Sequence, residues 1–335
     1  MKGKQGMVCM GLLLVLSSCH TGKQITASGL QRKDFQTEVN GQHTDLFTLS
    51  NKQGMEVCIT NYGARVVSIL VPDRNGKRED VVCGFSTITE YMEQRQNFGS
   101  TVGRYIGRIL NARFTLDGVE YKLVPNNGKS GHISHGGNPG FADRIWKVEQ
   151  ADTHRVCLSY LSPDGENGFP GNLKVTLVYS LGEDDNALDL TYEATTDAPT
   201  VLNLSHHSFF NISGNFTKSV EDQQLWVDAD RFTPYDDKKC VTGEYLQVAG
   251  TPLDFRMPHA IGECIDADHP QLKVVNGYDH TWELNTKGDD TRPAAWVYDP
   301  ASGRKMEIFT TEPGMQIYTG NGLKGKMTGK GGMAY

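Results

Sequence analysis

The chain is dominated, from residue 45 onward, by an alternation of apolar and polar residues with a period of two. Clear apolar positions of this kind are Met55, Val57 and Ile59, then Leu173, Val175, Leu177 and Tyr179, then Leu188, Leu190 and Tyr192. A period of two is typical of β-strands that turn one face to a core. The dipeptide Asp117-Gly118 between two alternating runs predicts a tight hairpin.

Stretches with a helical period are short and few, and no Gly/Ser-rich or Pro-rich linker follows residue 45. The sequence also shows no fixed-period repeat. Strands separated by turns over roughly 290 residues favour one large antiparallel β-sandwich. We therefore predict an all-β fold, with a β-sandwich domain over residues 41–335.

Composition narrows the class of protein further. Of the 335 residues, 33 are Lys or Arg and 40 are Asp or Glu, which gives a net charge of −7. An acidic balance argues against nucleic acid as a partner, because phosphate binding needs a basic face. The 38% hydrophobic and 22% charged residues are ordinary for a chain that buries a core, so neither a disordered chain nor a membrane bundle is expected.

The first residues have the pattern of an export signal. Lys2 and Lys4 precede an apolar run from Met7 to Leu16, which is too short to span a bilayer. The following Ser17-Ser18-Cys19 resembles the end of a bacterial lipobox. We predict a lipoprotein signal peptide over residues 1–18, lipidation of Cys19 and a tether over residues 19–40. Ordinary signal cleavage, with Cys19 incidental, is the alternative.

This reading predicts an exported protein, periplasmic or at the cell surface, that contacts the membrane only through its lipid and is a monomer by default. Five cysteines remain after this segment: Cys58, Cys83, Cys157, Cys240 and Cys264. Their number is odd and no Cys-x-x-Cys pair occurs, so neither a zinc knuckle nor a disulfide framework is indicated.

Two histidine clusters are the best candidates for chemistry. One runs from His132 to Gly137 and contains His135, and the other contains His206 and His207. Imidazole titrates near neutrality and can lend or take a proton at working pH. If residues 203–209 form a strand, the two adjacent histidines point to opposite faces and cannot share one metal ion. Proton transfer is therefore favoured over metal catalysis; no metal ligand is assigned, and a structural Ca²⁺ ion is left open.

Charged residues beside glycines and aromatics suggest the kind of substrate. Arg104 and Arg108 lie four residues apart among glycines, and Asp279 lies between Tyr278 and Trp282. A sugar suits such a mixture, because its hydroxyls take charged partners and its C–H faces take rings. A turn beside a buried tryptophan explains the second group equally well.

Taken together, the motifs resemble the aldose 1-epimerase (galactose mutarotase) family. The matching segments, in family order, are Phe98-Gly-Ser-Thr-Val-Gly-Arg-Tyr-Ile-Gly-Arg-Ile109, His135-Gly-Gly, Ser162-Pro-Asp-Gly-Glu-Asn-Gly-Phe-Pro-Gly171, Asn203-Leu-Ser-His-His-Ser-Phe-Phe-Asn211, Thr242-Gly-Glu244, Asn276-Gly-Tyr-Asp-His280, Thr310-Thr-Glu-Pro-Gly314 and Tyr318-Thr-Gly-Asn321. The resemblance implies the galactose mutarotase-like supersandwich. It also implies interconversion of the α and β anomers of free aldohexoses, galactose and glucose, without a cofactor.

The resemblance also implies roles for four residues. His207 matches the general acid, and His135 matches a second histidine that hydrogen-bonds near the ring oxygen. Arg108 and Asp279 match residues that bind sugar hydroxyls. Two positions depart from the pattern: His206 and Gly107 stand where relatives often carry Asn, so His206 is taken as structural and one hydroxyl contact is expected to differ.

The family's general base is a glutamate in a strand beyond the segment that ends at Tyr335, so we expect a sandwich without its C-terminal strands. Losing a general base removes on the order of 10²–10⁴ in rate. Glu244, Glu307 and Glu312 do not fall in the matching motif. A non-catalytic sugar-binding lipoprotein, or an inactive truncated relative, is therefore the alternative. An epimerase for phosphorylated hexoses is disfavoured by the acidic balance and the export signal.

Overall fold

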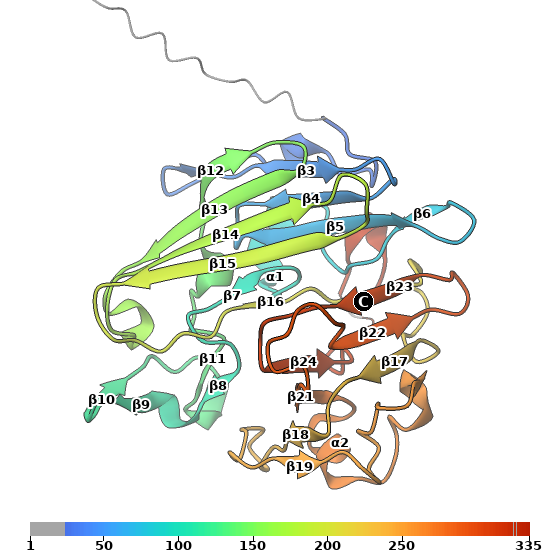
Figure 1. The fold of residues 1–335 in the computed structure, drawn as a ribbon. Helices are drawn as coiled ribbons and strands as arrows, with labels where there is room; N and C mark the ends of the chain where they lie inside the picture. Colours follow the sequence, from blue (N-terminus) through green and yellow to red (C-terminus); the bar gives the residue numbers. More distant parts are fainter. Residues whose placement is uncertain (1–23, 324, 326) are drawn as a thin grey trace, which may run out of the picture.

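The computed structural model describes residues 24–323, 325 and 327–335, and most of its elements are strands (Figure 1). Two four-stranded antiparallel sheets form the larger part of the molecule. The first consists of β3 (Leu46–Ser50), β4 (Glu56–Thr60), β5 (Arg65–Pro72) and β6 (Arg78–Asp80). The second consists of β12 (Lys147–Ala151), β13 (Arg155–Ser162), β14 (Leu173–Leu181) and β15 (Leu188–Thr196).

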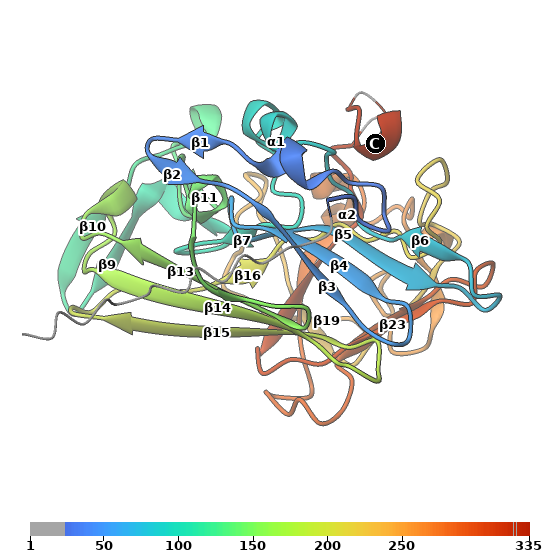
Figure 2. The ribbon, with the colours of Figure 1, turned by 90° about the horizontal axis from the view of Figure 1, so that it is seen from above.

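These two sheets pack face to face as two layers (Figures 1 and 2). Their inner faces share one hydrophobic core, in which Val57 and Ile59 of β4 meet Val175 and Leu177 of β14. Along β14 the buried residues alternate with more exposed ones, as the period of two predicts. The predicted all-β sandwich is confirmed.

The outer face of β4 is also buried, which the alternation does not predict. All five residues of β4 are buried, because the second sheet covers one face of the strand and the N-terminal segment covers the other. In that segment Leu30 and Phe35 are buried, and the backbone N–H of Ala27 donates to the Glu56 carboxylate at 2.6 Å.

The described part of the predicted tether, residues 24–40, is therefore packed on the domain rather than free. A tether over residues 19–40 is wrong for this part, because its apolar residues belong to the core. The predicted signal peptide over residues 1–18 and the lipidation site Cys19 lie outside the described residues.

Two smaller antiparallel sheets form the second half of the fold. One consists of β20 (His259–Ala260), β17 (Gln224–Val227), β22 (Ala295–Tyr298) and β23 (Lys305–Ile308). The other consists of β19 (Leu246–Gln247), β18 (Arg231–Thr233), β21 (Asp279–Glu283) and β24 (Gly314–Tyr318). A second hydrophobic core lies between them, and it contains Val227, Phe232 and Trp282.

Four two-stranded antiparallel pairs complete the strands. They are β1 (Glu38–Val39) with β2 (Gln42–His43), β7 (Thr101–Val102) with β16 (Ser205–His206), β8 (Arg108–Ile109) with β11 (Ile133–Ser134), and β9 (Arg113–Leu116) with β10 (Val119–Lys122). Leu116 pairs with Val119 across Asp117 and Gly118, both of which have positive φ. This confirms the predicted hairpin, whose two-residue turn needs that backbone conformation.

Helical structure is short. The two α-helices are α1 (Ile88–Gln94), which begins with a capping box at Thr87, and α2 (Pro270–Val275). Single 3-10 turns occur at Arg32–Phe35, Leu110–Ala112, Gly128–Ser130, Phe141–Asp143, Glu166–Gly168, Ile261–Glu263 and Lys330–Gly332. Within the described residues, none of the helices has the length and apolar character needed to cross a bilayer.

Candidate active site

The two neighbouring histidines of the second cluster point to opposite sides, as expected. His206 ends β16, which pairs with β7, and its ring contacts Tyr179 at a centroid distance of 6.2 Å. His207 continues the extended backbone, and its N–H donates to the Ser100 carbonyl at 2.9 Å. The His207 ring lies edge-to-face against the ring of His135, with centroids 5.5 Å apart. The fold thus brings together the two predicted catalytic histidines, 72 residues apart in the sequence.

The pairing of β11 with β8 fixes His135. Its backbone N–H donates to the Gly107 carbonyl at 2.9 Å, and the Gly107 N–H donates to His135 Nδ1 at 3.3 Å. Since Nδ1 accepts this bond, we place the proton of the neutral ring on Nε2. Gly107 has φ +82°, a left-handed conformation that glycine adopts readily. The contact with His135 Nδ1 is made by its backbone N–H.

The surroundings lower the pKa of both rings. Burial lowers the pKa of His135 to about 3, and the nearby His207 and Arg108 act in the same direction. Burial also lowers the pKa of His207. At neutral pH His135 therefore offers an uncharged N–H donor, a group suited to an oxygen that gains negative charge.

Arg108 lies on β8 beside this pair. Its Nη1 donates to the Lys239 carbonyl at 2.8 Å. Its Nε is buried and, within the described part of the chain, has no hydrogen-bond partner. A buried guanidinium donor without a partner is costly, which makes Arg108 a candidate for a contact with a ligand.

Asp279 begins β21 and is fixed by its neighbour in the same sheet, β24. Its Oδ1 accepts from Gln316 Nε2 at 2.7 Å. The same amide group donates to the Tyr235 hydroxyl at 3.4 Å, and the Gln316 oxygen accepts from the Thr281 hydroxyl. Burial raises the pKa of Asp279, and the bond from Gln316 and the charge of Arg108 oppose that change.

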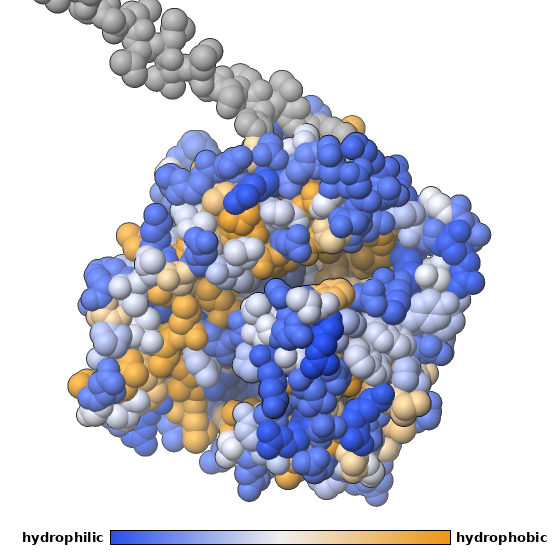
Figure 3. Space-filling model, in the orientation of Figure 1, coloured by the Kyte–Doolittle hydropathy of each residue, from blue (hydrophilic) through white to orange (hydrophobic). Residues whose placement is uncertain are grey.

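Aromatic contacts connect the histidine pair to Asp279. The Phe209 ring stacks on His207 at 5.2 Å and meets Tyr318 edge-on at 5.6 Å. Tyr318 is the residue of β24 that pairs with Asp279. The predicted residues therefore lie in one region, between the larger sandwich and the smaller sheets, and the surface of this face is hollowed there (Figures 1 and 3).

Other residues singled out in the sequence lie outside the site. His132 is buried, and its Nδ1 accepts from the Asn111 N–H at 3.0 Å. Arg104 is buried and bonds to the loop that follows β13. Tyr278 and Trp282 are buried in the second hydrophobic core, so they do not supply the ring face expected beside Asp279.

Sequence reasoning missed Gln316, Tyr235 and Phe209. Phe209 lies inside one of the matching motifs but has no role there, and the same holds for Tyr318, the partner of Asp279 in the sheet. The available signal for Gln316 was a polar residue that shares the period of two with Tyr318. That signal is weak without knowledge of which strand pairs with β21.

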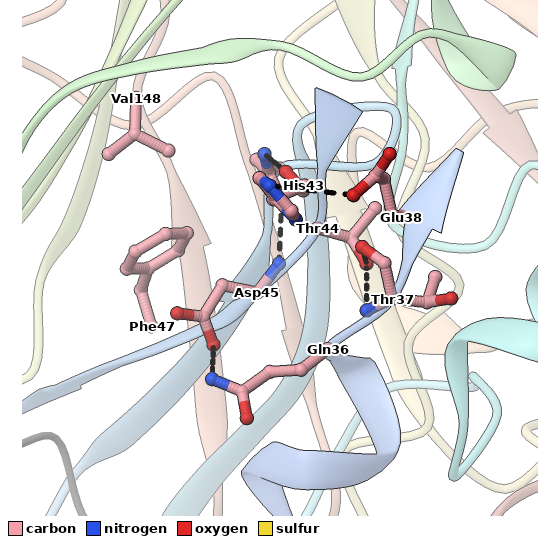
Figure 4. Close-up of a pocket in the computed structure, with 9 residues that line it drawn as sticks. Gln36, Thr37, Glu38, His43, Thr44, Asp45, Phe47 and Val148 are labelled. Carbon is pink, nitrogen blue, oxygen red and sulfur yellow. Dashed lines mark hydrogen bonds and ion pairs between the residues drawn. The ribbon is translucent and has the colours of Figure 1, made fainter. Parts of the chain in front are cut away.

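A separate cavity of about 620 Å³ lies beside the N-terminal segment, lined by Asp45, His43 and Phe47 among others (Figure 4). Of the residues that line it, Asp45 accepts from Arg32 and from Gln36. The bond from Arg32 attaches the N-terminal segment to the residue before β3. Nowhere in residues 24–323, 325 and 327–335 do three or more His, Cys, Asp or Glu side chains gather as metal ligands would.

Comparison with known proteins agrees with this geometry. A family model described as aldose 1-epimerase matches residues 45–335. The galactose mutarotase of Bos taurus is 40% identical over 290 residues, which are 86% of this chain and 81% of that protein. The aldose 1-epimerase of Escherichia coli (strain K12) is 36% identical over 286 residues, 85% of this chain and 81% of that protein.

Solved structures give the same answer. The crystal structure of galactose 1-epimerase from Lactobacillus acidophilus superposes with a TM-score of 0.77 at 30% identity, covering 87% of this chain and 83% of that one. A GalM/aldose epimerase homologue from C. elegans gives a TM-score of 0.78 at 30% identity, over 87% and 86% of the two chains. The fold and site define a carbohydrate isomerase. The chain belongs to the aldose 1-epimerase family.

Proposed function

We propose that this protein interconverts the α and β anomers of free aldohexoses, galactose and glucose, and that His207 is the general acid. The observation that carries the proposal is the contact of His135 with His207, 5.5 Å between ring centroids, beside Arg108 and Asp279. The relatives named galactose mutarotase and aldose 1-epimerase support the choice of reaction.

The reaction needs one proton delivered and one removed. Protonated His207 gives its proton to the ring oxygen as the bond from that oxygen to C1 breaks, while the anomeric hydroxyl loses its proton to a base. The product is the open-chain aldehyde, which rotates about the bond between C1 and C2 and recloses on the other face by the reverse steps. No electrons are transferred, so the chemistry requires no redox cofactor. Burial lowers the pKa of His207 and so makes its protonated form a stronger acid.

The other site residues hold the sugar and the developing charge. His135 donates its Nε2 proton toward the ring oxygen region, where electron density increases as the bond to C1 breaks. Arg108 donates to sugar hydroxyls and Asp279 accepts from them. Gln316 keeps the Asp279 carboxylate in place by donating at 2.7 Å. A fixed donor, Arg108, and a fixed acceptor, Asp279, together orient the anomeric centre of the sugar.

We assign the base to none of the described glutamates. Glu244 bonds to Thr242, Glu307 pairs with Lys305, and both are exposed, as is Glu312. Across the described residues, none of the three contacts the histidine pair.

The test of the acid uses two neighbouring variants. His207→Ala is expected to lower the catalysed rate of anomer exchange by about 10²–10⁴-fold, the usual contribution of a general acid. The matched control is His206→Asn, which changes the adjacent residue on the opposite face and puts there the residue that relatives often carry. Exchange is measured by magnetization-transfer NMR on equilibrated galactose, with folding checked by circular dichroism. Unchanged exchange in folded His207→Ala would remove His207 from the mechanism.

The export signal leads to a proposal about location: the protein is a lipoprotein anchored through Cys19, so that it meets sugars outside the cytoplasm. Support comes from the charged, apolar and small-residue pattern of residues 2–19. Cys19→Ser is expected to move the protein from the membrane fraction to the soluble fraction of bacterial cells, and to abolish incorporation of a labelled fatty acid. The unlabelled wild-type protein in the soluble fraction would contradict the anchor.

A further inference from the structure

The loop between β13 and β14, residues 163–172, carries most of a sequence motif, residues 162–171, to which the reaction gives no role. Asn167 lies in it with φ +51°, and its side chain crosses to the turn that carries His135. There Asn167 Nδ2 donates to the Gly136 carbonyl at 2.9 Å and to the Pro139 carbonyl at 2.9 Å. The Asn167 amide group thus connects two carbonyls of the turn that directly follows His135.

The turn fits closely against this amide. A Cβ atom added at Gly137 would lie 2.5 Å from Asn167 Cγ, so only glycine leaves room for the contact. A Cβ added at Gly136 would strike the Gly103 carbonyl. The two glycines that follow His135 are therefore packed between residue 167 on one side and the 103–104 backbone on the other.

The loop is itself rigidly held, which is what a support requires. The Glu166 carboxylate accepts from Arg144 at 2.6 Å and from the Tyr160 hydroxyl at 2.7 Å. Arg104, four residues before the site residue Arg108, donates to four loop carbonyls at 2.7–3.1 Å: those of Ser162, Pro163, Pro170 and Gly171. The Asn167 carbonyl accepts from the Val124 N–H at 3.0 Å.

We propose that Asn167 is a positioning residue for His135: its two hydrogen bonds fix the turn so that the His135 ring stays against His207 with its Nε2 proton directed at the sugar. This inference rests on the proposed function for the role of His135. Asn167 acts through that ring. Its loss therefore affects the chemical step more than the binding of sugar, since displacement of a catalytic group by about 1 Å costs up to about a hundredfold in rate.

The experiment compares Asn167→Gly with Asn172→Gly. Glycine accepts the positive φ of residue 167 and removes only its side chain. Asn172 lies at the end of the same loop, and its side chain bonds to Asp197 at 2.7 Å and to the Asp164 N–H at 3.0 Å but not to the turn that carries His135. We expect Asn167→Gly to lower kcat for galactose about tenfold to a hundredfold with KM within about threefold, and Asn172→Gly to keep the wild-type kcat. Asn167→Asp, which keeps the shape but loses both donors, should resemble Asn167→Gly.

A second readout does not depend on activity. In protein labelled with ¹⁵N-histidine, the His135 ring signals, assigned with His135→Gln, should shift or broaden in both Asn167 variants and stay unchanged in Asn172→Gly. Wild-type kcat and unshifted His135 signals in either folded Asn167 variant would overturn the inference. Equal losses in the Asn167 and Asn172 variants would also overturn it, because they would show a general effect of the loop. A wild-type protein without anomerase activity would instead reject the proposed function, and the ring signals would still decide whether Asn167 holds His135.

Discussion

At the scale of single residues, the site depends on which atoms are already bonded. His135 Nδ1 is occupied by the Gly107 N–H, so its other nitrogen carries the proton of the neutral ring. The Nε of Arg108 is buried without a partner among the described residues, whereas Arg104 uses its donors on loop carbonyls. Arg104 is thus structural, whereas Arg108, four residues later, is left for the proposed contact with sugar hydroxyls. Their spacing in the sequence could not distinguish them.

Asp279 leads to a prediction, at the scale of single residues, about how the KM for galactose depends on pH. Burial raises its pKa above the ordinary 3.8, so as pH falls the carboxylate is protonated earlier than in an exposed aspartate. Only the ionised carboxylate accepts from sugar hydroxyls with both oxygens. The KM for galactose should therefore rise as pH falls through the raised pKa, while His135, with a pKa of about 3, stays neutral.

Initial rates between pH 7 and about pH 4 test this, with Asp279→Asn as the comparison. The variant should have a higher KM at neutral pH and no further rise on acidification. A wild-type KM that stays constant to about pH 4, with the protein folded, would show that Asp279 is not a charged sugar contact.

At the scale of elements, short strands determine where the site residues lie. β7, β8, β11 and β16 have two residues each, yet their pairing places Arg108, His135 and His207 together. Strands of two residues are too short for an alternating pattern to be recognised. The site residues could therefore be predicted from motifs, but their arrangement in space could not. Long strands were predicted better: β14 shows the expected alternation along nine residues. β4 is buried on both faces, because residues far away in the sequence cover it.

Arg104 provides the test at this scale, because it holds the loop after β13. Its side chain is 1% exposed and donates to four loop carbonyls and the Ser162 hydroxyl. Arg104→Met leaves these carbonyls buried without donors, and we expect a loss of about 3–5 kcal/mol in the free energy of unfolding.

Urea denaturation measures this loss. The control is Arg113→Met, an exposed arginine on β9 whose ion pair with Glu120 at 3.9 Å should matter by less than about 0.5 kcal/mol. Equal stabilities of the two variants would mean that the loop is not held by Arg104.

At the scale of the whole molecule, the site lies where the two halves of the fold meet. The histidine pair comes from segments beside the larger sandwich, and Asp279 with Gln316 comes from a smaller sheet. The sequence predicted the all-β class from its alternation. The family resemblance supplied Arg108, His135, His207 and Asp279, which the fold brings into one region.

The sequence could not predict what depends on contacts between distant segments. The N-terminal residues 24–35 pack on β4, although their polar pattern predicted a tether. Gln316 reaches Asp279 only because β24 pairs with β21 in one register, with Thr281 opposite Gln316. In neither case does the local sequence pattern show which segments will contact each other.

The most direct measurement of the central claim is polarimetry of freshly dissolved α-D-galactose at neutral pH with the purified protein. Buffer alone and the His207→Ala protein serve as controls, and calorimetry measures galactose binding in parallel. We expect the optical rotation to reach equilibrium at least about tenfold faster than in buffer, since acid catalysis alone supplies about 10²–10⁴-fold. With His207→Ala, we expect a rate close to that of buffer. A folded protein that binds galactose but leaves the buffer rate unchanged would contradict the account and identify a sugar-binding protein without catalysis.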